Sequence, residues 1–188
     1  MRRALVGGLA GGLVILALLV VVDGMLGFKR GIEMKRLPDE RIVYAFLGEH
    51  VTEPGRFVLN PELLPDQRFP SDDPIFAVQY SGLGHDDAGQ EVVLGLVVAF
   101  MAPFVGAWLL VNASSRVLSR YRLRVLFLAG IGVVVALLGT TARFGINSYP
   151  LGDAVALGLH DLASWVLAGL VVAWVVRPAK ARGESRAG

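Results

Sequence analysis

The sequence predicts an all-α integral membrane protein with four transmembrane helices and a small external α+β cap between the first and second helices. Three observations predict it. Of the 188 residues, 54% are hydrophobic and only 18% are charged, which is too apolar for a soluble domain. Four runs are free or nearly free of charge over the ~20 residues that a helix needs to cross a bilayer. Lys and Arg are concentrated in the short segments at one side of these runs, a bias typical of cytoplasmic loops.

The expected transmembrane helices follow from the positions of these runs. Residues 4–22, 92–111 and 125–142 contain no charged residue. The fourth run, 154–176, contains a polar pair near its beginning and is uninterrupted from Leu162 onward. We expect a helix for each, because a helix pairs its backbone amides within the segment. The first run is longer than the ~7–15 residues of a signal-peptide core, so we expect a retained anchor.

The orientation follows from the basic residues of the short segments, because these residues resist translocation. The connection 23–91 holds seven Lys or Arg against thirteen Asp or Glu. We therefore expect both termini and the loop 112–124 in the cytoplasm, with 23–91 and the turn 143–153 external, in a bacterial inner membrane. Ten basic residues then lie on the cytoplasmic side, the last four of them in or at the start of the tail 177–188: Arg2, Arg3, Arg116, Arg120, Arg122, Arg124, Arg177, Lys180, Arg182 and Arg186.

The external segment is expected to fold, because its apolar residues are grouped and bounded by Pro and Gly. Pro38, followed by acidic residues, predicts a short helix at about 38–50, with the acids near the positive end of its dipole. Two β-like runs follow at about 56–59 and 75–80. A cap with so few residues would need the membrane helices or a partner to complete its core.

Two short motifs carry a family resemblance. They are Glu53-Pro54-Gly55-Arg56-Phe57-Val58-Leu59-Asn60-Pro61 and Phe144-Gly145-Ile146-Asn147-Ser148-Tyr149-Pro150. The layout resembles small uncharacterised bacterial four-helix membrane proteins with an external Gly-Val-Tyr-x-x-Pro-like element, although Arg56 and Phe57 stand where the Val and Tyr would be. The resemblance covers most of the chain and implies the topology, and it implies no activity.

Four ionisable residues form an expected polar cluster around the external hairpin: Arg143, Asp153, His160 and Asp161. An ionisable residue within a span is a functional-site hypothesis. A pair between Arg143 and Asp153 or Asp161 would lower the free energy of a charge near lipid, and His160 would titrate near neutral pH if it faced water. Three interpretations stay open: stabilisation of the hairpin, contact with a lipid headgroup, quinone or partner subunit, and proton transfer.

Several kinds of site are not predicted. Without cysteine there is no disulfide, thiolate metal site or cysteine nucleophile. One histidine in the spans does not supply the two axial ligands of a haem, and His85-Asp86-Asp87 fits no metal-binding spacing. No Gly-x-Ser-x-Gly element is present, and no concentrated basic surface indicates a nucleic-acid partner. We therefore assign no catalytic residue, cofactor or metal.

Small residues four apart predict close helix packing, because they let helix backbones approach each other in lipid. We expect most of these positions to pack inside the bundle, with one outer face available to a partner helix. Thr140 is a further small residue, four positions after Ala136 on the same face of the third span. The positions are Gly7, Gly8, Gly11 and Gly12 in the first span, Gly132 and Ala136 in the third, and Gly169 and Ala173 in the fourth.

The absence of a clear motif favours a non-catalytic accessory or structural subunit that packs against a larger membrane complex, such as a bioenergetic assembly. Its partners would be the lipid bilayer and other membrane subunits or a second copy. A small-molecule or proton-coupled carrier is the first alternative, and it would show a continuous polar cavity. A membrane enzyme using Arg143, His160 and Asp161 is the second, and it would show a cleft that holds these groups together.

Overall fold

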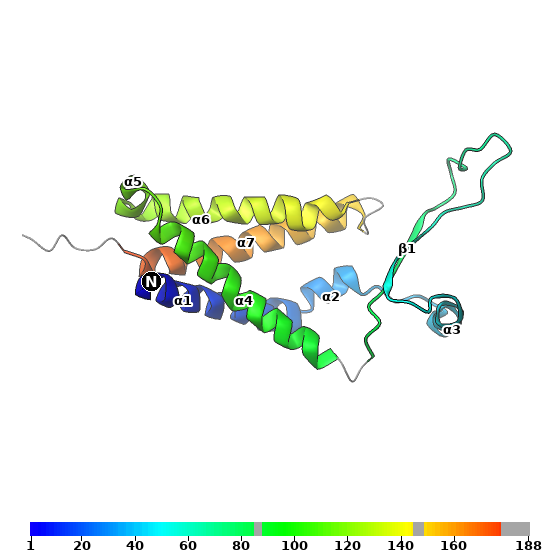
Figure 1. Cartoon of the computed structure of the whole chain (residues 1–188), viewed down its shortest axis with the longest axis horizontal. Coiled ribbons are helices and arrows are strands. Elements are labelled where there is room, and N and C mark those ends of the chain that lie inside the picture. The colour runs from blue at the N-terminus through cyan, green and yellow to red at the C-terminus, as the bar shows by residue number, and fades with distance from the viewer. Residues whose placement is uncertain (85–87, 145–148, 178–188) are drawn as a thin grey trace, which may run out of the picture.

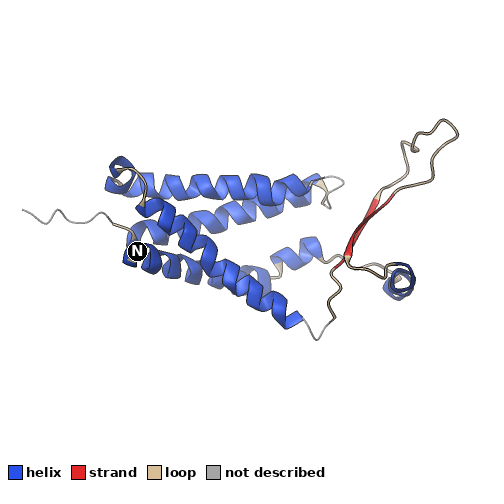
Figure 2. Ribbon diagram, in the orientation of Figure 1, coloured by secondary structure: helices blue, strands red, loops and turns tan. Residues whose placement is uncertain are grey.

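Four helices long and apolar enough to cross a membrane run alongside one another in the computed structural model, which describes residues 1–84, 88–144 and 149–177 (Figure 1). This part of the prediction is confirmed. A small two-stranded sheet lies away from the long helices (Figure 2). The four candidate spans are Arg2–Met25, Val92–Val111, Tyr121–Arg143 and Leu151–Val175.

Two of the long helices change their winding towards one end. The first is α-helical at its start and π-helical where it ends, and Gly27 then turns the chain with φ 67°, a conformation that favours glycine. The third helix changes in the same way. The helical elements are α1 (Arg2–Leu18), η1 (Leu19–Met25), α2 (Phe28–Glu33), α3 (Glu40–His50), α4 (Ala88–Val111), α5 (Ser115–Ser119), α6 (Tyr121–Val135), η3 (Ala136–Thr140), η4 (Thr141–Arg143) and α7 (Leu151–Val175).

The glycines of α1 face the inside of the bundle. A Cβ atom at Gly8 would lie 2.6 Å from the Cα atom of Phe104 in α4, so the two backbones touch. Gly11 lies against Pro103, where an added Cβ would lie 2.9 Å from the proline Cβ. Gly7 and Gly12 also face neighbouring helices, across from Val176 and Phe100 respectively. Close backbone contacts of this kind at small residues are typical of helices that pack against each other in a bilayer.

The second small-residue interface joins α6 to α7. A Cβ at Gly132 would lie 2.6 Å from the Cβ of Trp165, and one at Gly169 would lie 3.1 Å from the Cβ of Leu128. Ala136 and Ala173 are buried. The core that results lies in the half of the bundle near the N-terminus and is made of Ala107, Leu110, Leu128, Val172, Ala173 and Val176.

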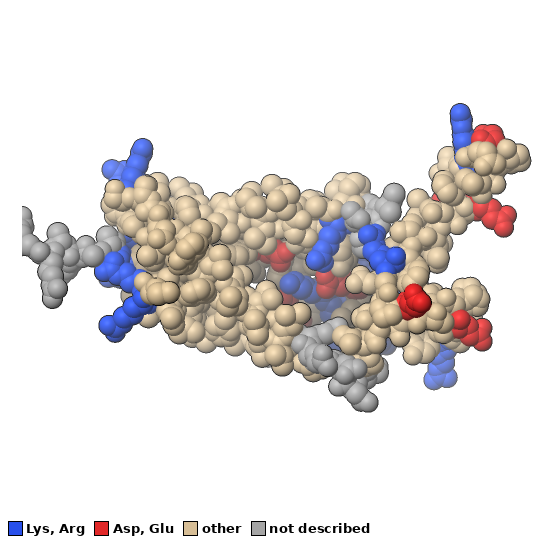
Figure 3. Space-filling view, viewed as in Figure 1, with Lys and Arg blue, Asp and Glu red and all other residues tan. Residues whose placement is uncertain are grey.

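One end of the bundle gathers the N-terminus, α5 and Arg177, the last described residue, and is called the basic end here (Figure 1). Arg3 Nη1 donates a hydrogen bond to the carbonyl of Arg177 over 2.9 Å. Lys and Arg side chains gather at this end, and few charged side chains show along the middle of the bundle (Figure 3). Residues 178–188 of the expected tail lie outside the described residues.

Arg124 is an exception among the basic residues, because it is only 6% exposed. Its Nε donates to the carbonyl of Ala173 over 2.9 Å, and its Nη1 donates to the carbonyl of Leu118. These carbonyls lie in or near the C-terminal ends of helices, where the last backbone carbonyls have no N–H partner within the helix and need another hydrogen-bond donor. Arg124 therefore links α5, α6 and α7.

The opposite end, called the distal end, carries α2 and the segment with α3 and the sheet. The sheet pairs β1 (Gly55–Leu59) antiparallel with β2 (Phe76–Tyr80). No residue of α3 is buried, and each strand has one half-buried residue, its third. The described part of the expected cap therefore has no core of its own.

Candidate functional site

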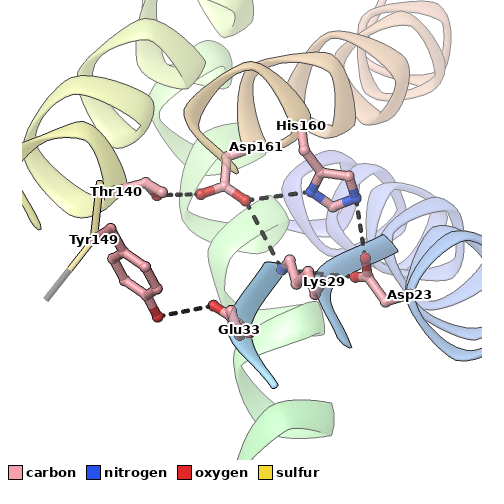
Figure 4. A network of polar contacts seen from close by, with 7 residues as sticks. All are labelled: Asp23, Lys29, Glu33, Thr140, Tyr149, His160 and Asp161. Carbon is pink, nitrogen blue, oxygen red and sulfur yellow. Dashed lines mark hydrogen bonds and ion pairs between the residues drawn. The ribbon is translucent and has the colours of Figure 1, made fainter. Parts of the chain in front are cut away.

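His160 and Asp161 of α7 meet the distal end of the first long helix (Figure 4). His160 Nε2 lies 3.2 Å from Oδ1 of Asp23, in η1, and its Nδ1 lies 3.6 Å from Oδ1 of Asp161. The imidazole is thus placed between two carboxylates. On its face, the ring of Phe28 stacks at a centroid distance of 4.9 Å with 16° between the planes.

Lys29 and Thr140 complete this group. Lys29 Nζ lies 3.6 Å from Asp23 Oδ2 and 3.9 Å from Asp161 Oδ1, so one ammonium contacts both carboxylates. The Thr140 hydroxyl donates to Asp161 Oδ2. We call these five residues the His160 cluster. It carries one net negative charge with a neutral imidazole and none with an imidazolium, and such pairing is what allows charges to persist inside a bundle.

His160 and Asp23 are the most buried side chains among the charged residues of the cluster, and part of their hydrogen-bonding capacity is unused. The side chains of His160 and Asp23 are 12% and 15% exposed. Asp23 Oδ1 and both imidazole nitrogens are buried with no hydrogen-bond partner among the described residues. They are close enough for ion pairs, but their directions are not those of hydrogen bonds. Buried polar atoms are normally satisfied, so these three atoms are the hydrogen-bonding positions that the described residues of the cluster leave open.

Two of the five residues of the His160 cluster lie in π-helical segments. Asp23 lies in the π-helical η1, and Thr140 ends the π-helical η3. Single π-helical turns shift side chains out of α-helical register and are frequent at functional sites. After the turn at Gly27, α2 brings Lys29 and Phe28 back over α7.

A cavity of about 270 Å³ lies against the cluster. It extends from the distal end to the middle of the bundle, and Figure 3 shows a hollow there in which acidic and basic atoms are visible. Ser164, one helical turn from His160, also lines it. Its other lining residues are apolar: Ile15, Leu18, Leu19, Val98, Ala99, Ala102, Pro103, Val135 and Trp165. A largely apolar cavity with a few convergent polar groups is the usual form of a ligand site.

Of the four residues expected to cluster, the structure brings His160 and Asp161 together. Asp153 instead pairs with Lys35, whose Nζ lies 2.7 Å from Asp153 Oδ2. Asp161 pairs with Lys29, so neither carboxylate expected to pair with Arg143 does so among the ion pairs of the described chain. The basic partners come from the connection after the first span rather than from the hairpin.

Arg143 lies beside Tyr149 at the end of the hairpin. The Tyr149 hydroxyl donates to Glu33 Oε1 over 3.2 Å. Burial raises the pKa of Tyr149, and the negative charge of Glu33 raises it further, while Arg143 acts in the opposite direction. Glu33 and Lys35 thus join the α2 region to the start of α7, although residues 145–148 of the turn are not described.

The sequence interpretation missed Asp23, Lys29 and Thr140. Asp23 is the first charge after an uncharged run, and that position was its one available signal. Within the described ranges, no group of three or more His, Asp or Glu is placed to hold a metal ion. His85, Asp86 and Asp87 lie outside those ranges.

No protein-family model, curated protein or solved structure matches this chain. The resemblance to small bacterial four-helix proteins therefore gains no support from these comparisons. The function has to be argued from the geometry of the His160 cluster and of the surfaces around it.

Proposed function

We propose that the chain is a membrane enzyme that uses His160 as a general acid and base, with Asp23 and Asp161 as positioning residues. The observation that carries this proposal is the placement of the imidazole between two carboxylates at the wall of a cavity. A base held by a carboxylate beside a space for a substrate is the arrangement that proton-transfer catalysis requires.

The proposed setting is a bilayer, in a bacterial inner membrane, with the basic end in the cytoplasm and residues 23–91 external. The four apolar helices and the basic residues at one end support this orientation. His160 is nine residues from the start of α7, which is about 13 Å along a helix. The site thus lies inside the external half of the bilayer, where a membrane-resident substrate reaches it.

The chemistry follows from the charges. The imidazole accepts the proton that a hydroxyl group or a water molecule in the cavity loses as its oxygen attacks an electrophilic carbon or phosphorus atom of the substrate, and it then gives this proton to the leaving group. The two carboxylates stabilise the imidazolium that forms in between. Lys29 limits the negative charge of the cluster. The uptake of one proton by His160 therefore changes the net charge of the cluster from one negative charge to none. Proton transfer by a positioned side chain contributes about 10²–10⁴ to a rate.

The geometry gives less support to a carrier. A carrier needs its site to open alternately to both sides of the membrane. The half of the described bundle between the cavity and the basic end is filled by buried side chains such as Leu110, Leu128 and Val172. This packing favours a site with access from one half of the bilayer.

A comparison of lipid turnover tests the enzyme proposal. Wild type, His160→Gln and His50→Gln would each be reconstituted in vesicles made from a bacterial lipid extract, and the lipids followed by mass spectrometry. His50 is a matched control because it also stacks on a phenylalanine, Phe46, but on the exposed helix α3. We expect a lipid species to change with wild type and His50→Gln, and at least about 10²-fold more slowly with His160→Gln. Equal rates for His160→Gln and wild type, or no change with wild type, would contradict the proposal.

An accessory role in a larger membrane complex is a second candidate, and the segment with α3 and the sheet favours it. Apolar side chains of α3, including Ile42, Tyr44 and Phe46, are exposed, and the described segment has no core of its own. Exposed apolar surface of this kind is typical of interaction sites. The partner is another membrane subunit with an external domain.

Native mass analysis after mild-detergent purification tests this second role. A defined subunit should travel with wild type and with His160→Gln but should be lost with Phe46→Glu, which places a charge on the exposed face of α3. Lys29→Gln is the control, because it changes a charge away from that face and should keep the partner. A protein that runs alone, or a partner that stays with Phe46→Glu, would contradict the accessory role.

A further inference from the structure

A second cavity of about 420 Å³ opens between α4 and α6 on the outer surface of the bundle. Side chains of α4 at its rim, such as Met101 and Val105, are exposed. All its lining residues are apolar or glycine: Val98, Met101, Ala102, Val105, Gly106, Leu109, Ile131, Val135 and Trp165. A groove of this composition in a bilayer accepts hydrocarbon and offers nothing to a polar group.

This α4–α6 groove adjoins the cavity at the His160 cluster. Val98, Ala102, Val135 and Trp165 line both. Trp165 is the largest of these four side chains, and small residues of the neighbouring helices make room for it. A Cβ at Gly106 of α4 would lie 3.2 Å from its ring, and one at Gly132 of α6 would lie 2.6 Å from its Cβ. The surface groove and the buried polar group are therefore parts of one lateral site.

We propose that this lateral site binds one hydroxyl-bearing lipid, with an acyl chain in the α4–α6 groove and the hydroxyl group at His160 and Asp23. The inference rests on the proposed enzyme function and names the class of its substrate.

The atoms of Asp23 and His160 that have no hydrogen-bond partner favour a ligand with a hydroxyl group. Asp23 Oδ1 can only accept a hydrogen bond when ionised, whereas the imidazole offers a donor and an acceptor nitrogen. A hydroxyl donates to the carboxylate and accepts from the imidazole, so it satisfies both sides. An ester or phosphodiester only accepts, and would leave the buried carboxylate oxygen unpaired, which is unfavourable. A lipid alcohol such as diacylglycerol therefore fits better than phosphatidylcholine.

Trp165 provides a direct probe of binding. Trp108 and Trp174 are exposed, so a Trp108→Phe, Trp174→Phe protein keeps Trp165 as its single tryptophan with little change to the packing. Reconstituted in phosphatidylcholine vesicles, it would be titrated with diacylglycerol whose chains carry bromine, a fluorescence quencher. Brominated phosphatidylcholine with the same chains is the comparison lipid. We expect saturable quenching, half-complete at an about tenfold lower mole fraction for diacylglycerol, because one hydrogen bond to a charged group distinguishes the lipids.

Two variants locate the bound chain. Ala102→Leu, in the single-tryptophan background, fills the junction of the two cavities and should abolish the saturable component. Gly130→Leu adds the same side chain to α6 where an added Cβ meets open space, and should leave the titration unchanged. Quenching that is linear in both lipids, equal for both lipids, or unaffected by Ala102→Leu would overturn the inference. Because the titration measures no turnover, saturable binding without any His160-dependent reaction would contradict the enzyme proposal alone.

Discussion

His160 Nε2 lies 3.2 Å from Asp23 Oδ1, although these residues belong to the last and the first of the four long helices. The contact joins the first and last long helices at the distal end of the bundle. Lys29 Nζ lies 3.6 Å from Asp23 Oδ2 and 3.9 Å from Asp161 Oδ1, so its charge offsets part of the negative charge of the two carboxylates.

Asp23→Asn should lower the turnover by about 10²-fold or more, because the amide keeps the size of the carboxylate but does not stabilise an imidazolium. Asp23→Glu should restore part of the rate. The measurement is the rate of the lipid change as a function of pH. A purely structural role of Asp23 would lower the amount of folded protein and leave the pH profile of the remainder unchanged. Asp66→Asn, at an exposed carboxylate, is the control.

Gly8→Ala should destabilise the bundle by about 1–3 kcal/mol, because the new methyl group would overlap the backbone of Phe104. Gly130→Ala should be neutral or slightly stabilising, since nothing lies within 4 Å of an added Cβ there and alanine favours the helix. Thermal unfolding in detergent, followed by circular dichroism, compares the two. Equal melting temperatures for both variants would show that α1 and α4 do not pack through Gly8.

Arg124→Met should destabilise the basic end by about 2–3 kcal/mol, because it removes charged donors from the carbonyls of Ala173 and Leu118. Arg122→Met removes the same charge from an exposed position and should change the stability by less than about 0.5 kcal/mol. Denaturant unfolding in mixed micelles measures both. The interpretation of Arg124 as a structural residue fails if Arg122→Met has the larger effect.

Tyr149→Phe should weaken the loss of stability at alkaline pH. Burial, with the charge of Glu33, raises the pKa of Tyr149 above its ordinary value of 10.0 in the folded chain. A raised pKa adds stability that is complete below the unfolded pKa and is lost as the pH rises through the folded pKa. The melting temperature of wild type should therefore fall more steeply above about pH 10 than that of Tyr149→Phe. Parallel curves would contradict a raised pKa of Tyr149 in the folded chain.

The sequence was sufficient to predict the four long helices, because uncharged runs such as 92–111 have few alternatives in lipid. It also indicated His160 and Asp161, since charges inside an apolar run stand out. It did not indicate the tertiary partners of these residues. The pairing of Asp161 with Lys29, and of Asp153 with Lys35, depends on how α2 folds back after Gly27.

The π-helical segments are the second feature of the site that the sequence did not indicate. In the sequence, residues 19–25 and 136–140 look like continuations of regular α-helices, and no local pattern indicates that they are π-helical. The change of winding nevertheless occurs where Asp23 and Thr140 reach the cluster. The sequence interpretation favoured an accessory subunit because no catalytic motif is visible in the sequence, whereas the enzyme that we propose depends on contacts that only the folded chain makes.

Cross-linking of Asp23→Cys with His160→Cys tests the central claim most directly, that the ends of the first and last spans share one site. The chain contains no cysteine, so the engineered pair is unambiguous. A protease site inserted between α4 and α6 would separate the two positions after cleavage. Treatment of intact membranes with a short bifunctional thiol reagent should keep the two fragments joined, while the His50→Cys, His160→Cys pair should release them. Fragments that separate equally in both proteins would contradict the account.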